Sequence, residues 1–147
     1  MSILSFLKPK DTFPASVLPI KTDIHSHLIP AIDDGVQSIE ESLTVLREME
    51  ALGYEKVITT PHSMPGTYDN SPENIYAGLE VMREAIKKEG INIQLEAATE
   101  YYLDESFVEL IDSGAPLMTF GKKYVLFETP FMNMPPQLKE VTFKLSL

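Results

Sequence analysis

The chain has 147 residues, of which 44% are hydrophobic and 23% are charged, the composition of one ordinary globular domain. Its 22 acidic and 12 basic side chains give a formal net charge of −10, which disfavours binding to the phosphate backbone of a nucleic acid. Cysteine is absent, so disulfides, thiolate metal ligands and a cysteine nucleophile are excluded. No apolar run approaches a transmembrane span and the apolar start is too short for a signal peptide, so a cytoplasmic location is expected.

Residues 1–20 are predicted to form an extension that precedes the domain of residues 21–147. Pro9, Pro14 and Pro19 recur through this stretch and keep its backbone irregular. Packing on the domain surface is the simplest role for such a tail.

From Lys21 onward, strand and helix patterns alternate. After a first strand that ends near His25 and His27, strands are predicted at residues 56–60, 91–98 and 124–127. Helices are predicted at residues 38–52, 72–89, 104–111 and 137–147. Ser38 with Glu41 and Ser71 with Pro72 are typical of helix starts. The alternation predicts an α/β fold with a parallel sheet and crossover helices.

A His-x-His pair follows the first apolar stretch, at His25 and His27. Residues i and i+2 of a strand point to the same face, so both imidazoles can reach one point. A strand whose two histidines are simply satisfied by hydrogen bonds is the alternative. Two converging imidazoles favour a metal site.

Further candidate ligands stand at the ends of the next predicted strands: His62, Glu100 and Glu128. The carboxyl ends of parallel strands meet at one edge, where active sites of α/β proteins are built. Each of these residues could instead be an ordinary loop or surface residue. Glu128, however, follows an apolar strand that is expected to be buried on both faces, and a carboxylate there is costly without a cation.

We therefore predict a metal site formed by His25, His27, His62, Glu100 and Glu128. Imidazoles and carboxylates without thiolates suit Mn²⁺, Fe or Zn²⁺ rather than Ca²⁺. Five ligands exceed the protein share of one catalytic ion, so two or more ions are expected. Asp33, Asp34 and Gly35 are interpreted mainly as a turn, with a minor role for Asp34 as a proton acceptor. Residues 64–68 form either a loop over the substrate or a simple connection.

These motifs together resemble the PHP (polymerase and histidinol phosphatase) superfamily. The stretch Asp23-Ile24-His25-Ser26-His27-Leu28, with Asp33-Asp34-Gly35, Thr60-Pro61-His62, Glu100-Tyr101-Tyr102 and Glu128, is most similar to the protein-tyrosine phosphatases encoded with capsule and exopolysaccharide synthesis genes. The resemblance implies a distorted TIM-like (β/α)₇ barrel and two or three divalent ions, manganese first and iron or zinc as alternatives. The five candidate ligands fall on the superfamily's ligand positions.

The resemblance runs from about Lys21 to Leu147 and covers only the N-terminal half of such a barrel. Relatives add a later histidine with a nearby arginine and an Asp-x-His, and none of these follows Glu128 here. Arg47 and Arg83 lie on predicted helices, so no arginine is expected at a phosphate site. The chain is therefore expected to be a truncated barrel, impaired in activity and prone to self-association.

For the intact protein, the resemblance implies hydrolysis of phosphotyrosine on the tail of a cognate bacterial tyrosine kinase of polysaccharide synthesis. Two metal ions would lower the pKa of a bridging water and clamp the phosphate oxygens. A small-molecule phosphatase similar to histidinol phosphatase is one alternative. An inactive half-domain that binds metal or a partner is the other.

Overall fold

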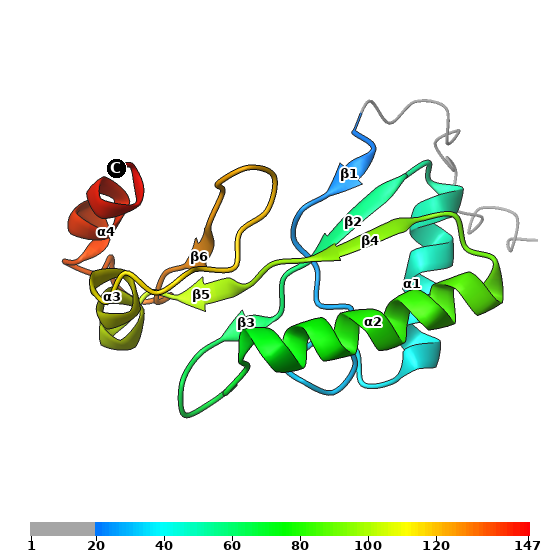
Figure 1. The fold of residues 1–147 in the computed structure, drawn as a ribbon, viewed down its shortest axis with the longest axis horizontal. Coiled ribbons are helices and arrows are strands. Elements are labelled where there is room, and N and C mark those ends of the chain that lie inside the picture. The colour runs from blue at the N-terminus through cyan, green and yellow to red at the C-terminus, as the bar shows by residue number, and fades with distance from the viewer. Residues whose placement is uncertain (1–19) are drawn as a thin grey trace, which may run out of the picture.

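The computed structural model describes residues 20–147, which form an α/β fold with short parallel strands and four helices (Figure 1). Apart from Ile20, the extension expected at residues 1–20 lies outside the described residues. The elements are β1 (Thr22–Asp23), α1 (Ile39–Ala51), β2 (Lys56–Thr59), β3 (His62–Ser63), α2 (Pro72–Glu89), β4 (Gln94–Ala97), β5 (Glu100–Tyr102), α3 (Glu105–Asp112), β6 (Leu126–Glu128) and α4 (Leu138–Leu145). The predicted alternation of strands and helices is confirmed.

All strand pairs of the two sheets are parallel, in the orders β1-β2-β4 and β3-β5-β6. Two chain segments run from the first sheet directly into the second, because β2 leads into β3 and β4 leads into β5 (Figure 1). Pro61 lies between β2 and β3, and a proline cannot donate a ladder hydrogen bond. Across this break the Glu100 amide donates to the Pro61 carbonyl, at 3.1 Å, so the neighbouring strands stay in register.

Local sequence chemistry sets the ends of the helices. The side chains of Ser38, Ser71 and Asp104 accept hydrogen bonds from the first turns of α1, α2 and α3. Each such cap contributes about 1 kcal/mol. The predicted capping box at α1 is only half formed. The Ser38 hydroxyl accepts from the Glu41 amide, but the Glu41 side chain accepts from the Gln37 amide rather than from the Ser38 amide. Gly90 ends α2 at φ 67°, a conformation that glycine adopts without strain.

Two hydrophobic cores hold the helices to the sheets. The larger core joins α1 and α2 to the β1-β2-β4 sheet, with Leu46, Val57 and Met82 all at 0% exposure. The smaller core joins α3 and α4 to β5 and β6, around Tyr101, Phe107 and Val141. In Figure 1 these two assemblies lie at opposite ends of the molecule, and the strand breaks lie between them. The starts of β3 and β5 therefore lie between two packed cores.

Two predicted strands differ from those observed. The third was expected at residues 91–98, but β4 begins at Gln94, since the Ile91 amide donates instead to the Ile86 carbonyl at the end of α2. The fourth was expected at residues 124–127 with both faces buried, and this is wrong. Phe120 and Tyr124 bond to each other across a turn, which leaves Tyr124 68% exposed, and β6 is only partly buried.

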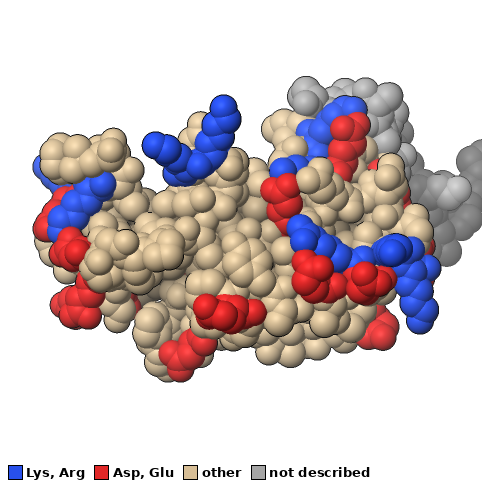
Figure 2. All heavy atoms as spheres, in the orientation of Figure 1, with Lys and Arg blue, Asp and Glu red and all other residues tan. Residues whose placement is uncertain are grey.

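Charged side chains of both signs are interspersed on the visible face in Figure 2 and do not gather into one basic patch there. None of the helices in the described part of the chain is long and apolar enough to cross a membrane.

Candidate metal centre

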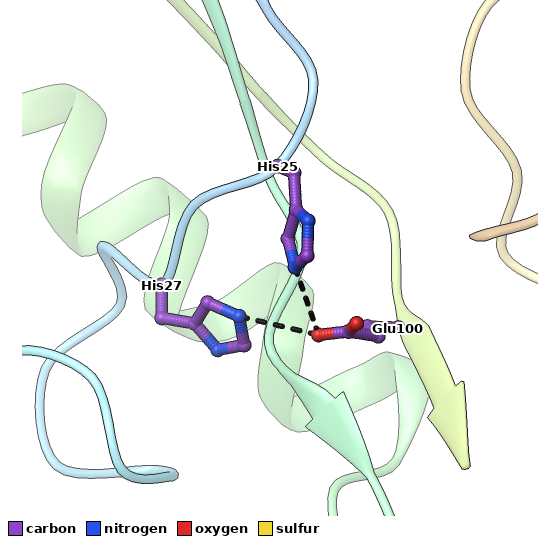
Figure 3. Close-up of side chains that lie close together, drawn as sticks. All are labelled: His25, His27 and Glu100. Atoms are coloured by element: carbon purple, nitrogen blue, oxygen red, sulfur yellow. Dashed lines mark hydrogen bonds and ion pairs between the residues drawn. The ribbon is translucent and has the colours of Figure 1, made fainter. Parts of the chain in front are cut away.

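His25 and His27 lie in the segment after β1 and not on a strand, because β1 ends at Asp23. The strand alternation that predicted their convergence is therefore wrong in detail. Hydrogen bonds from strand β2 hold this segment instead: the Thr59 hydroxyl donates to the Ser26 carbonyl, at 3.0 Å, and accepts from the Leu28 amide, at 2.9 Å. The two histidines flank Ser26, and both rings are directed toward Glu100 (Figure 3).

Glu100, the first residue of β5, is at the centre of the cluster. Its side chain is 5% exposed, and a single oxygen, Oε2, lies near three imidazoles. The distances are 3.0 Å to His25 Nε2, 3.3 Å to His27 Nε2 and 3.4 Å to His62 Nδ1. A buried carboxylate is stabilised by such surroundings only where cationic partners or metal ions balance its charge.

His62 and Glu128 reach the same place through the register of the second sheet. His62 opens β3 directly beside Glu100, and Glu128 ends β6 beside Tyr102. His62 Nδ1 lies 3.6 Å from Glu128 Oε1, yet this buried nitrogen has no hydrogen-bond partner. The Glu128 side chain is 37% exposed and β6 is only partly buried, so the argument from a fully buried strand does not apply to it.

The ligand atoms form three overlapping groups, each lying within 4.8 Å. These are His25, His27 and Glu100; His27, Asp34 and His62; and His62, Glu100 and Glu128. The structure thus brings all five predicted residues together and adds Asp34. An unpartnered buried imidazole nitrogen beside two carboxylates fits a bound cation. The nitrogen and oxygen donors suit Mn²⁺, Fe or Zn²⁺.

Asp33 lies behind the histidines and is buried. Its Oδ2 accepts from His27 Nδ1 at 2.7 Å and from the His62 amide at 3.0 Å, and its Oδ1 accepts from the Gly35 amide at 3.0 Å. Burial alone would raise the pKa of Asp33, but the hydrogen bonds from His27 and the two amides hold that pKa below its ordinary value. The hydrogen bond with Asp33 is the main cause that raises the pKa of His27, against the opposing effect of burial.

Comparison with known proteins identifies the group to which this arrangement belongs. Residues 21–145 match the family described as capsular polysaccharide synthesis, CpsB/CapC. The chain belongs to the CpsB/CapC family. The match begins where the structure's first strand begins and extends through α4, so it includes every residue of the cluster.

Relatives in the CpsB/CapC family are named as tyrosine phosphatases. The chain is 27% identical over 125 residues to the tyrosine-protein phosphatase YwqE of Bacillus subtilis, covering 85% of this chain and 49% of YwqE. It is 26% identical to a putative tyrosine-protein phosphatase, CapC of Staphylococcus aureus, covering 84% of this chain and 48% of CapC. It therefore spans about half the length of the curated relatives that it matches.

A solved structure gives the same result for the fold. It comes from work on YwqE from Bacillus subtilis and CpsB from Streptococcus pneumoniae, described as unique metal-dependent tyrosine phosphatases. The TM-score is 0.77 at 26% identity, with 85% of this chain and 51% of that chain covered. The resemblance inferred from the motifs is thus confirmed as membership of the CpsB/CapC family.

Asp33 and Asp34 are the two site residues that sequence reasoning underrated. An Asp-Asp-Gly stretch is ordinary turn chemistry, and only its position six residues after His27 indicated more. Asp34 Oδ1 lies 3.4 Å from His62 Nε2. Position 35 requires glycine for a steric reason, because a Cβ there would lie 2.3 Å from His27 Cβ. The two arginines lie in ion pairs: Arg47 pairs with Glu89, and Arg83 pairs with Glu80.

Residues 64–68 close into a small turn rather than forming a long cover. The Met64 amide donates to the Tyr68 carbonyl at 3.1 Å, and the ring of Tyr68 stacks on His62 with centroids 5.5 Å apart. The Asn70 side chain donates to the carbonyls of His62 and Ile32, at 2.8 Å and 2.9 Å. Tyr68 and Asn70 therefore hold the ring and the backbone of His62 in place.

Proposed function

We propose that the protein to which this chain belongs is a metal-dependent phosphomonoester hydrolase that acts on phosphotyrosine. The observation that carries the proposal is the convergence of three imidazoles on one oxygen of the buried Glu100. The names of the relatives as tyrosine phosphatases support the substrate class. A bacterial tyrosine kinase of capsule synthesis is the proposed protein substrate, in keeping with the family's description.

In this proposal, His25, His27, His62, Glu100 and Glu128 hold two or three divalent ions, and Asp34 is a further candidate ligand. Manganese is the proposed metal, with iron or zinc as alternatives. When bound, the ions would polarise the phosphate ester and lower the pKa of an attacking water. This chain contains no cysteine, so its own residues offer no cysteine nucleophile.

The chain's own residues would orient the reactants. Glu100 belongs to two of the ligand groups, so it can hold two neighbouring ions at a fixed separation. Within the described residues, the arginines of α1 and α2 pair with glutamates on those helices, so the ions would supply the positive charge that this half of the site offers a phosphate. His25 is half exposed, which leaves that side of the cluster open to a substrate.

We further propose that residues 21–147 correspond to the N-terminal part of a distorted (β/α)₇ barrel. Four successive parallel strand positions support this: β1, β2 with β3, β4 with β5, and β6. Helices α1, α2 and α3 connect them in sequence. In such barrels the site is built at the carboxyl ends of the strands. The cluster residues follow β1, β2 and β4 and end β6, which agrees with that position.

The proposal is tested on this chain by two measurements, metal binding and phosphate release. Metal-free protein is titrated with Mn²⁺, Fe²⁺ and Zn²⁺ by calorimetry, and phosphate release from a phosphotyrosine peptide is measured beside release from histidinol phosphate. Binding is expected to require His27, so His27→Ala should lower metal affinity and turnover together. His27→Ala is compared with Gln94→Ala, an exposed residue of β4 whose side chain donates a hydrogen bond to Glu96. Full turnover in excess chelator, or preference for histidinol phosphate, would contradict the proposal.

A further inference from the structure

One carboxylate, Asp33, joins the two segments that supply the histidines. It lies six residues after His27 and 29 residues before His62 in the sequence. Its side chain is 0% exposed, and its two oxygens accept three hydrogen bonds. Such a buried, fully engaged carboxylate holds its partners in one arrangement, because any rotation would leave a buried donor unsatisfied.

The contact of Asp33 with His27 determines which ring nitrogen can bind a metal ion. An ionised carboxylate only accepts hydrogen bonds, so His27 Nδ1 must carry the proton that it donates to Asp33. In the neutral imidazole, Nε2 is then the free lone pair. Nε2 faces Glu100, at 3.3 Å, on the side where His25 also lies.

The same contact limits how His27 can act toward Asp34. Nδ1 lies 4.0 Å from Asp34 Oδ1, and this is the nitrogen that lies 2.7 Å from Asp33. A protonated Nδ1 cannot serve as a ligand, so His27 offers Nε2, the nitrogen that lies 3.3 Å from Glu100.

A second hydrogen bond to the same oxygen of Asp33 comes from the backbone of His62. The His62 amide donates to Asp33 Oδ2 at 3.0 Å, and Pro61 before it has no amide of its own to offer. Asp33 therefore fixes where β3 begins, and with it the position of the His62 ring beside Glu100 and Glu128.

We propose that Asp33 is the positioning residue of the centre, which fixes the tautomer of His27 and the backbone of His62 so that both rings offer their lone pairs to the ions. The inference rests on the proposed metal-dependent function. Outer carboxylates that orient histidine ligands typically change metal affinity by about 10- to 100-fold when they are removed.

The first test is made on the metal-free wild-type chain and does not depend on activity. Two-bond ¹H–¹⁵N correlation spectra of the imidazoles, recorded at a pH where the rings are neutral, report the tautomer of each of the three histidines. His27 is expected to carry its proton on Nδ1. A proton on Nε2 of wild-type His27 would overturn the proposal.

The second test uses Asp33→Asn, which keeps the shape of the side chain but cannot accept from all three donors at once. The expected results are loss of the fixed Nδ1–H tautomer, faster hydrogen exchange at the His62 amide and about 10- to 100-fold weaker binding of Mn²⁺. The matched control is Glu41→Gln, which removes one charge from an exposed carboxylate that also accepts from a backbone amide, at 2.7 Å. The control should leave all three readouts unchanged.

The outcomes separate this inference from the proposed function. Wild-type protein that binds no metal ion would contradict the proposed function, whereas the tautomer measured without metal would still stand. If Asp33→Asn weakens metal binding but keeps the wild-type tautomer and His62 exchange, Asp33 is not the positioning residue. If Asp33→Asn does not fold, the tautomer in the wild-type protein decides the question.

Discussion

At the scale of single residues, Glu100 and Glu128 are both glutamates at strand ends, but their surroundings differ. Glu100 is 5% exposed and approaches all three histidines, whereas Glu128 is 37% exposed and approaches only His62. A ligand that two ions share is harder to replace than a ligand at the rim of the cluster. Their removal should therefore have unequal effects.

Glu100→Gln is expected to remove most of the bound metal, because it takes a charge from two of the ligand groups. Glu128→Gln should remove at most one ion and leave the group of His25, His27 and Glu100 intact. The measurement is the metal content per chain by mass spectrometry after equilibration with Mn²⁺. Glu105→Gln, an exposed residue at the start of α3, is the control and should bind as wild type does. Equal losses in the two site variants would contradict the shared role of Glu100.

The proposed metal binding should also depend on pH. The pKa of His27 is raised, chiefly by its hydrogen bond with Asp33. A metal ion must displace the imidazolium proton, so affinity should fall as the pH is lowered through this raised pKa. The fall should begin above about pH 6.5, the ordinary value for histidine. Calorimetry in two buffers of different ionisation enthalpy measures the released proton.

His27→Gln, which has no titrating ring, should release fewer protons than the wild-type chain. Unchanged Mn²⁺ affinity as the pH is lowered from about 8 to about 6 would contradict the assignment of a raised pKa to a ligand.

At the scale of elements, helix α2 packs on the segment that carries the first two histidines. Gly78 of α2 faces Ile29, and a Cβ at Gly78 would lie 2.3 Å from Ile29 Cγ2. Ile29 is 2% exposed and belongs to the larger core, so it has little room to move. The glycine permits the close approach of helix and segment, which fixes the distance of the segment from the sheet.

Gly78→Ala should therefore destabilise the protein, although glycine to alanine normally stabilises a helix interior by about 1 kcal/mol. Overpacking against Ile29 should cost about 1–3 kcal/mol and outweigh that gain. Ala77→Gly, at the exposed neighbouring position, is the matched control and should lose about 1 kcal/mol through propensity alone. Urea unfolding measures both changes. A more stable Gly78→Ala variant would show that Ile29 yields at little cost.

Much of this framework could be predicted from local sequence chemistry. Caps at Ser38, Ser71 and Asp104 set the helix starts, and hydrophobic periodicity gave the right order of elements. The end of the third strand was predicted closely, whereas its start was not. Ile91 and Ile93 alternate like strand residues, but α2 takes the Ile91 amide, a tertiary contact that no local pattern encodes.

The site could be predicted in composition but not in its internal connections. Strand-end positions identified the five candidate ligands, because parallel topology makes such ends meet. Asp33 looked like a turn residue, since its hydrogen bond to the His62 amide joins segments 29 residues apart. The ligand roles themselves stay a prediction, and so does the domain boundary near residue 21.

At the scale of the whole molecule, four strands have a neighbour on one side only within the described residues. These are β1 and β4 at the edges of the first sheet, and β3 and β6 at the edges of the second. Four strand positions are too few to close a barrel. Backbone donors and acceptors along such edges pair readily with another chain. Beyond β6, moreover, the segment of residues 131–134 exposes Phe131, Met132 and Met134 at 100%, 83% and 71%.

The 147-residue chain is therefore expected to self-associate. Adjacent exposed apolar side chains lose water contact when two copies meet, at about 25 cal/mol per Å² of apolar surface buried. Light scattering with sedimentation velocity, over a range of concentrations, should show species larger than a monomer. A triple variant with serine at Phe131, Met132 and Met134 should shift the distribution toward monomer.

The control for this last prediction lies on another element, helix α2. Tyr76 and Val81 on α2 are exposed too, at 52% and 53%, but they stand singly, and isolated apolar side chains are normal on protein surfaces. Serine at these two positions should leave association unchanged. If the wild-type chain stays monomeric at all concentrations, neither the strand edges nor the segment of residues 131–134 drives association. If the triple variant associates as strongly as wild type, the apolar segment is not the cause, and the unpaired strand edges are the surface to test next.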